Sequence, residues 1–278
     1  MKIKTTLIIA ATFIINLLPI SATAVSVYVQ YDGNTVLTDP ALVSASGSDF
    51  DVSANLQSGE FKGRALGQGG ASSQNAYSGN LGFLNLTNNT GNQVVIGAGD
   101  FTARVQGDYS FGGGSYQAAQ FNASLQVSIA GQPDYIASAA QTVAIGSALV
   151  DPGSTFTPRV QTNGASIVLT TASTSQLIMD LVMPELTLAP GDTMRVSWNS
   201  DLSVYTQATQ GQGGNFVEAD FFSGANGLTL GLALPAGVTL DSDATVPLDW
   251  ITTVPVPGAI WLFGSALGFL GWLGRKTT

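Results

Sequence analysis

The feature of this sequence that most restricts its fold is a strict alternation of apolar and polar residues in two neighbouring segments, 101–111 and 121–129. The apolar positions are Phe101, Ala103, Val105, Gly107, Tyr109 and Phe111 in the first segment and Phe121, Ala123, Leu125, Val127 and Ile129 in the second. A period of two places such residues on one face of a β-strand. Because a Gly-rich stretch joins the segments, we predict that they pair as antiparallel strands with one buried face.

Further strand candidates recur along the chain at short intervals. They lie near Val27 and Val95, at 165–171 after the turn Asn163-Gly164, at 193–198 and at 227–234, while 136–149 is ambiguous between strand and helix. The polar stretches 67–80 and 207–215 are expected to be surface loops, because they are rich in Gly, Ser and Asn. About ten strands predict a single all-β domain over 25–251, an antiparallel β-sandwich or jelly roll. A β-solenoid is the alternative, but no fixed repeat period is visible.

Composition and charge exclude several classes of function. The chain has no cysteine and no histidine, which removes disulfides, zinc sites with Cys or His ligands, Cys nucleophiles and His-based triads. Four of the nine basic residues lie at the two ends of the chain: Lys2, Lys4, Arg275 and Lys276. The sequence between these ends contains the other five basic residues and all 18 acidic ones, which gives it a net charge of −13. Nucleic-acid binding is not expected, because phosphates need Lys and Arg for neutralisation.

The N-terminus has the organisation of a secretory signal peptide over residues 1–24. Lys2 and Lys4 precede an apolar run from Leu7 to Leu18, and Ala22-Thr23-Ala24 offers the small residues of a cleavage site. We therefore predict cleavage after Ala24 and a mature chain that begins at Val25. A permanent N-terminal anchor is the alternative.

The C-terminus predicts a short membrane anchor. Residues 252–258 form an extended spacer, 259–274 an apolar transmembrane helix, and 275–278 a basic tail. The uncharged run from Ala259 to Leu273 would span about 22 Å as a helix, against a hydrocarbon core of about 30 Å. Arg275 and Lys276 would stay on the cytoplasmic side.

The Pro-x-Pro element Val254-Pro255-Val256-Pro257, the Gly- and Leu-rich apolar helix and the terminal pair Arg275 and Lys276 resemble the PEP-CTERM sorting signal of Gram-negative bacteria. In this chain Val256 stands where the family motif has Glu. The resemblance implies transient contact with exosortase and the inner membrane, release of the chain, and association with extracellular polysaccharide and biofilm. An ordinary anchor that is never cleaved is the alternative.

No residue pattern in the sequence indicates an active site. The sequence has no Gly-x-Ser-x-Gly elbow and no phosphate-binding loop, so we expect a non-enzymatic protein. No cofactor is expected, although calcium is possible because three pairs of carboxylates are spaced to share a strand face or loop: Asp49 with Asp51, Glu218 with Asp220, and Asp241 with Asp243.

The sequence analysis therefore predicts an exported structural or adhesive component of the cell surface or polysaccharide matrix. A carbohydrate-binding module is the first alternative, for which Trp198, Tyr205, Tyr116 and Trp250 offer stacking rings. A secreted glycoside hydrolase is the second, since that chemistry needs only two carboxylates.

Overall fold

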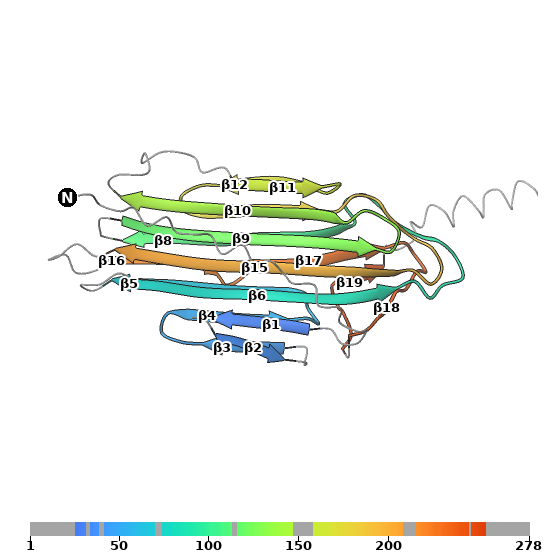
Figure 1. Ribbon diagram of the computed structural model, residues 1–278, viewed down its shortest axis with the longest axis horizontal. Helices are drawn as coiled ribbons and strands as arrows, with labels where there is room; N and C mark the ends of the chain where they lie inside the picture. The colour runs from blue at the N-terminus through green and yellow to red at the C-terminus, as the bar shows by residue number, and fades with distance from the viewer. Residues whose placement is uncertain are drawn as a thin grey trace, which may run out of the picture.

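The computed structural model describes residues 26–31, 34–38, 42–69, 74–112, 116–146, 158–207, 215–244 and 246–253. All 19 secondary-structure elements within these ranges are β-strands (Figure 1). The predicted signal peptide and the segment from Val254 onward, with the sorting element, membrane helix and basic tail, lie outside these ranges. Within them, no helix has the length and apolar character needed to cross a membrane.

Eight strands form the first sheet, here called sheet A, and its pairings are antiparallel. The strands follow one another in the order β11-β10-β9-β15-β6-β1-β2, and β18 pairs with β6. Their bounds are β11 Arg159–Asn163, β10 Tyr135–Gly146, β9 Tyr116–Ile129, β15 Thr193–Gln207, β6 Gln74–Thr87, β1 Ser26–Tyr31, β2 Asn34–Thr38 and β18 Asp241–Ser242.

Nine strands form the second sheet, sheet B. Their bounds are β12 Ser166–Ala172, β13 Gln176–Val182, β8 Phe101–Gly112, β16 Asn215–Phe221, β17 Gly227–Leu234, β5 Glu60–Gly69, β4 Phe50–Asn55, β3 Leu42–Ser46 and β19 Ile251–Thr253. Both β16 and β17 pair antiparallel with β8 and with β5, so they run end to end in one position of the sheet. β19 adds in parallel to β17, which places Thr252 and Thr253 in a strand.

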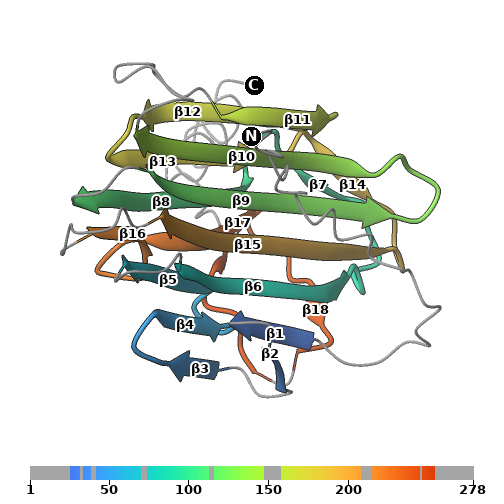
Figure 2. The same cartoon turned by 60° about the vertical axis from the view of Figure 1, so that its left-hand side comes forward.

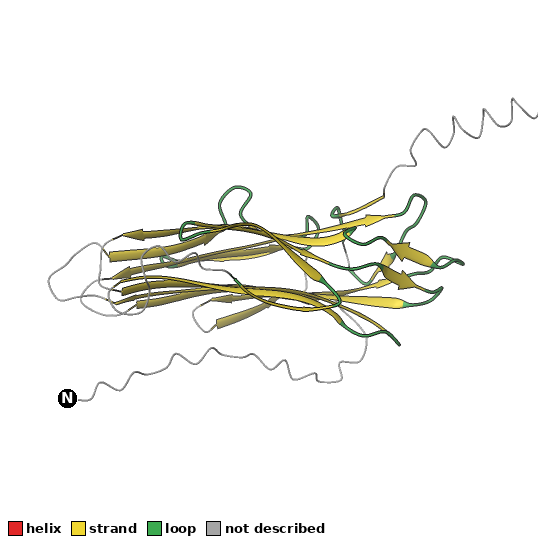
Figure 3. Cartoon of the chain, turned by 90° about the horizontal axis from the view of Figure 1, so that it is seen from above, coloured by secondary structure: helices red, strands yellow, loops and turns green. Residues whose placement is uncertain are grey.

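The two sheets lie face to face as two layers (Figure 3). Their facing sides are apolar because alternate residues of each strand point inward, as in β17, where Leu228, Leu230, Leu232 and Leu234 are all buried. A separate pair, β7 (Val94–Ile96) and β14 (Leu186–Leu188), lies at one end of the sandwich (Figure 2). This arrangement confirms the predicted all-β antiparallel sandwich.

The predicted pairing of 101–111 with 121–129 is wrong. Both segments are strands and their inward sides are buried as expected, but β8 belongs to sheet B and β9 to sheet A. The two strands contribute to the same core from opposite sides, where the ring of Phe221 stacks on Phe121 with centroids 4.4 Å apart and meets the edge of Tyr109 at 5.7 Å. Two strands paired in one sheet and two strands in facing sheets show the same alternation of apolar and polar residues, because each sheet has one apolar face.

The predicted turn at Asn163-Gly164 connects the two sheets: Gly164 has a φ of 66°, and the chain passes from β11 in sheet A to β12 in sheet B. One further expectation is corrected. The stretch 67–80, predicted as a surface loop, is largely strand, since β5 extends to Gly69 and β6 begins at Gln74. Ser78 and Asn80 are buried, and Asn80 Nδ2 donates to the Lys62 carbonyl at 3.0 Å. The ambiguous segment 136–149 is strand as far as Gly146.

Candidate functional site

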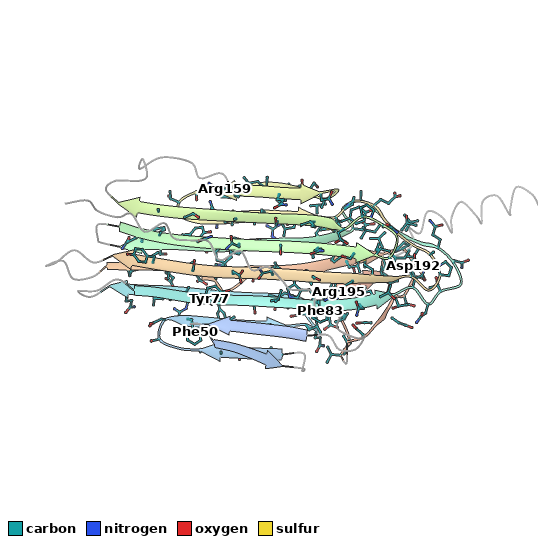
Figure 4. All side chains as sticks on the ribbon, viewed as in Figure 1. Phe50, Tyr77, Phe83, Arg159, Asp192 and Arg195 are labelled. Atoms are coloured by element: carbon teal, nitrogen blue, oxygen red, sulfur yellow. The ribbon has the colours of Figure 1, made fainter. Side chains whose placement is uncertain are left out.

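A shallow depression crosses the outer face of sheet A over β11, β10, β9 and β15. We call it the outer trough. Its volume is about 350 Å³, and its lining consists of Asn122, Ala123, Ser124, Ser138, Ala139, Ala140, Arg159, Val160, Gln161 and Asn199. The floor is low because Ser138, Ala140 and Ser124 have small side chains, whereas the longer Arg159 and Gln161 stand on β11. Figure 4 shows Arg159 on β11 and, further across the sheet, Tyr77 on β6.

The strand register arranges outward side chains at the trough in two rows that run across the strands, here called rungs. The first rung is Arg159, Ala140, Asn122 and Asp201 on β11, β10, β9 and β15. The second rung is Gln161, Ser138, Ser124 and Asn199 on the same strands. Because adjacent strands are about 4.8 Å apart, each rung presents a side chain at that interval.

A half-buried carboxylate lies at the β15 end of the first rung. Asp201 Oδ1 accepts a hydrogen bond of 2.8 Å from the Tyr77 hydroxyl, and Asp201 Oδ2 accepts one of 2.9 Å from Asn199 Nδ2. The neighbouring position on β6 is Gly79, where an added Cβ would lie 2.6 Å from Asp201 Oδ1 and 2.8 Å from the Tyr77 hydroxyl. Gly79 therefore makes room for the Tyr77–Asp201 contact.

Burial dominates the ionisation of this cluster. It raises the pKa of the Asp201 carboxyl above its ordinary value, while the hydrogen bonds from Asn199 and Tyr77 act in the opposite direction. The pKa of the Tyr77 hydroxyl is also raised, first by burial and then by the negative charge of Asp201. Tyr77 therefore stays protonated and donates its hydrogen bond at any physiological pH.

The cation at the opposite end of the first rung is exposed. The ion pairs found in the part of the chain that the structure describes join Arg64 to Asp51 and Glu218 and Arg104 to Asp180, and Arg159 is in none of them. Arg159 lines the trough from the edge strand β11.

One carboxylate from each of two pairs considered for calcium, Asp51 and Glu218, contacts the same arginine on sheet B. Arg64 Nη2 lies 2.5 Å from Asp51 Oδ2, and Arg64 Nη1 lies 3.4 Å from Glu218 Oε1. The register explains this contact, because β5 pairs with β4 on one side and with β16 on the other. Asp49 lies just before β4, where its backbone carbonyl accepts from Leu66 N at 2.7 Å.

The remaining carboxylates of those pairs hold loops. Asp220 Oδ1 accepts from the backbone amides of the two residues that follow Phe221, at 2.8 and 2.9 Å. Asp243 accepts from Asn85 N at 2.9 Å and from Asn85 Nδ2 at 2.7 Å, and Asp241 accepts from Asn89 Nδ2. Across the described ranges no group of three or more acidic, Cys or His side chains could hold a metal ion. Calcium binding stays a prediction.

The tryptophans proposed as stacking rings belong to the core. Trp198 is 1% exposed and its ring lies 4.7 Å from that of Phe61, while Trp250 is 5% exposed and its Nε1 donates to the Leu56 carbonyl at 3.0 Å. Tyr205 is half-buried on β15, and nothing is described of the Tyr116 side chain. The sugar-stacking platform is therefore not built by Trp198 or Trp250, because Trp198 lies on the inward side of β15 and Trp250 is buried in the turn before β19.

The trough itself was not predicted. The outward positions Asn122 and Ser124 follow from the alternation in 121–129, but their neighbours on β11 and β15 depend on sheet order. The predicted cleavage residues Ala22, Ala24 and Val25, and the sorting residues Val254, Pro255, Val256, Pro257, Arg275 and Lys276, lie outside the described ranges. No protein-family model matches the sequence, and no curated protein matches it significantly.

Proposed function

We propose that this chain is an exported, non-enzymatic component of the cell surface or extracellular matrix, associated with polysaccharide or biofilm. The observation that carries the proposal is the order of its segments: a signal-like N-terminus, a β-sandwich, and a Pro-x-Pro element followed by an apolar run and two cations. In this scheme the tail holds the precursor in the inner membrane, exosortase acts near Pro255 and Pro257, and the sandwich is released to the surface or medium.

Intact mass of the protein recovered from culture medium and from membranes tests this function. We expect a soluble form that begins at Val25 and ends near Pro257. A double substitution, Pro255→Ala with Pro257→Ala, should shift the protein to the membrane fraction, whereas Pro190→Ala in the turn before β15 should not. A wild-type form found only in membranes and retaining Arg275 and Lys276 would contradict release and leave the tail as an ordinary anchor.

The outer trough favours a second candidate function, carbohydrate binding. Its support comes from the amide and hydroxyl side chains on the outer face of sheet A rather than from Trp198 and Trp250. A glycoside hydrolase would need two carboxylates flanking one bond. The described residues that line the trough include no carboxylate, and Asp201 on β15, next to Asn122, is the one acidic residue of the two rungs. Release of reducing ends from a polysaccharide by the purified protein, abolished by Asp201→Asn, would favour the hydrolase instead.

A further inference from the structure

We propose that the outer trough binds a single chain of a neutral polysaccharide, laid across strands β11, β10, β9 and β15, with the two rungs of side chains recognising its hydroxyl groups. The juxtaposition that carries this inference is two parallel rows of amide and hydroxyl groups above a floor of small side chains. This inference rests on the carbohydrate-binding function proposed above and specifies its ligand class. It does not depend on how the tail is processed.

The chemistry of the lining matches sugar hydroxyls. Asn122, Asn199 and Gln161 each offer an amide that donates and accepts hydrogen bonds, and Ser124 and Ser138 offer hydroxyls that do the same. A sugar hydroxyl also both donates and accepts, so each of these groups can pair with it in either sense. All five belong to the two rungs, so they face the same side of the sheet.

The periodicity of the site favours an extended polymer that runs across the strands. Side chains of one rung recur at the strand spacing of about 4.8 Å, and the two rungs are two residues, or about 7 Å, apart along the strands. An interval of one strand is comparable to the length of one sugar ring. The trough is open rather than enclosed. An internal stretch of a long polysaccharide can therefore lie in it, and no free chain end is needed.

A peptide is a poorer occupant. The backbone amides and carbonyls of β10, β9 and β15 are paired with strands on both sides, so a peptide cannot add there as a further strand. The floor is made of Ala140 and Ser138 with Ser124 beside them, which gives no deep apolar pocket for a peptide side chain.

The charges at the site favour a neutral chain. Asp201 at one end of the first rung and Arg159 at the other offset each other, and the amides and hydroxyls between them carry no charge. The protein between its two ends has a net charge of −13, which repels a polyanion at low ionic strength. An anionic polysaccharide would therefore bind more weakly than a neutral one.

Part of the second rung is held in place before any ligand binds. Asn199 Nδ2 donates a hydrogen bond of 2.9 Å to Asp201 Oδ2. This bond fixes the orientation of the Asn199 amide, and its oxygen remains an acceptor for a ligand. Asp201 is fixed in turn by the Tyr77 hydroxyl at 2.8 Å. Asp201 and Tyr77 are thus positioning residues, and Asn199 is the residue that contacts the ligand. Fixing a side chain in advance lowers the entropy lost on binding.

Affinity electrophoresis and calorimetry of the purified full-length protein, using a soluble β-glucan, mannan and galactan as neutral probes and alginate as the anionic probe, test the inference. We expect at least one neutral probe to bind. Ala140→Phe, which fills the floor, should weaken that binding at least 10-fold, and Asn122→Ala about fivefold through the loss of a hydrogen bond. Ala233→Phe on the outer face of sheet B is the matched control and should bind as the wild type does.

Circular dichroism and the melting temperature establish that each variant is folded. The inference is overturned if no neutral probe binds, if folded Ala140→Phe binds as tightly as the wild type, if Ala233→Phe loses binding equally, or if alginate binds more tightly than every neutral probe. Binding without release of the tail would overturn the proposed processing alone, and normal processing without binding would overturn the trough alone.

Discussion

Gly82 is a position where a single added methyl group should destabilise the fold through a clash in the core. It lies on the inward side of β6, directly opposite Trp198 on β15. A Cβ at Gly82 would lie 2.2 Å from Trp198 Cζ2 and 2.5 Å from Cε2, far inside ordinary contact of about 3.5–4.0 Å. The indole cannot retreat freely, because it is 1% exposed and packs against Phe61 with ring centroids 4.7 Å apart.

The expected cost of Gly82→Ala combines two opposing effects. Overpacking of a filled core costs about 1–3 kcal/mol, and the lower entropy of the unfolded chain returns about 0.4–1 kcal/mol. We therefore expect a net loss of about 1–2 kcal/mol in the free energy of unfolding. For a domain of this size the melting temperature should fall by roughly 2–8 °C.

Guanidinium unfolding followed by tryptophan fluorescence measures this cost. Gly231→Ala on β17 is the matched control, because a Cβ there would meet only Thr102 Oγ1, at an ordinary 3.6 Å. Its free energy of unfolding should be unchanged or rise by up to about 1 kcal/mol, because the lower entropy of the unfolded chain is not opposed by a clash. In a Trp198→Phe background the cost of Gly82→Ala should shrink, since the clashing atoms are gone. An unchanged cost in that background would refute the steric explanation.

Three further predictions concern polar groups. Because burial raises the pKa of Asp201, its charge opposes folding at neutral pH and ceases to do so once the carboxyl is protonated. The stability of Asp201→Asn relative to the wild type should therefore decrease as the pH falls from about 7 to 3 in parallel urea titrations. Asn226→Ala removes hydrogen bonds of 3.0 Å to Asp108 and to the Asp220 carbonyl and should cost about 1–3 kcal/mol in urea unfolding; a loss below about 0.5 kcal/mol would contradict it. Arg64→Met should cost about 1 kcal/mol, and repeating the unfolding in about 1 M salt should reduce that cost because the ion pairs are partly exposed; a cost independent of salt would argue against them.

Asn226 lies in the loop that separates β16 from β17, which run end to end in sheet B. The chain leaves β16 at Phe221 and enters β17 at Gly227, whose φ is 129°. Asn226 is buried and joins this loop to Asp108 on β8 and to the end of β16. The loss of these two hydrogen bonds from a buried position is the physical basis of the predicted cost of Asn226→Ala.

The sequence by itself determined that several segments are strands and which of their faces are buried, although it predicted a loop at 67–80 and left 136–149 undecided. Alternation in 101–111, 121–129 and 227–234 predicted inward positions that the structure confirms. Successive side chains of a strand point to opposite faces, so the apolar residues of each segment must share one face. Likewise, Glu60, Lys62 and Arg64 recur at every second residue of β5 and therefore share one face, which points away from the core.

Only the tertiary structure decided which strands are neighbours. The inner faces of sheets A and B are equally apolar, so hydrophobic patterning cannot distinguish a hairpin within one sheet from a crossing between two, and the predicted pairing of β8 with β9 failed for that reason. The same ambiguity hides the outer trough, whose rungs join Arg159, Ala140, Asn122 and Asp201 from four strands. A row across a sheet is defined by strand order and register, and these follow from the packing of the whole core rather than from any local run of residues.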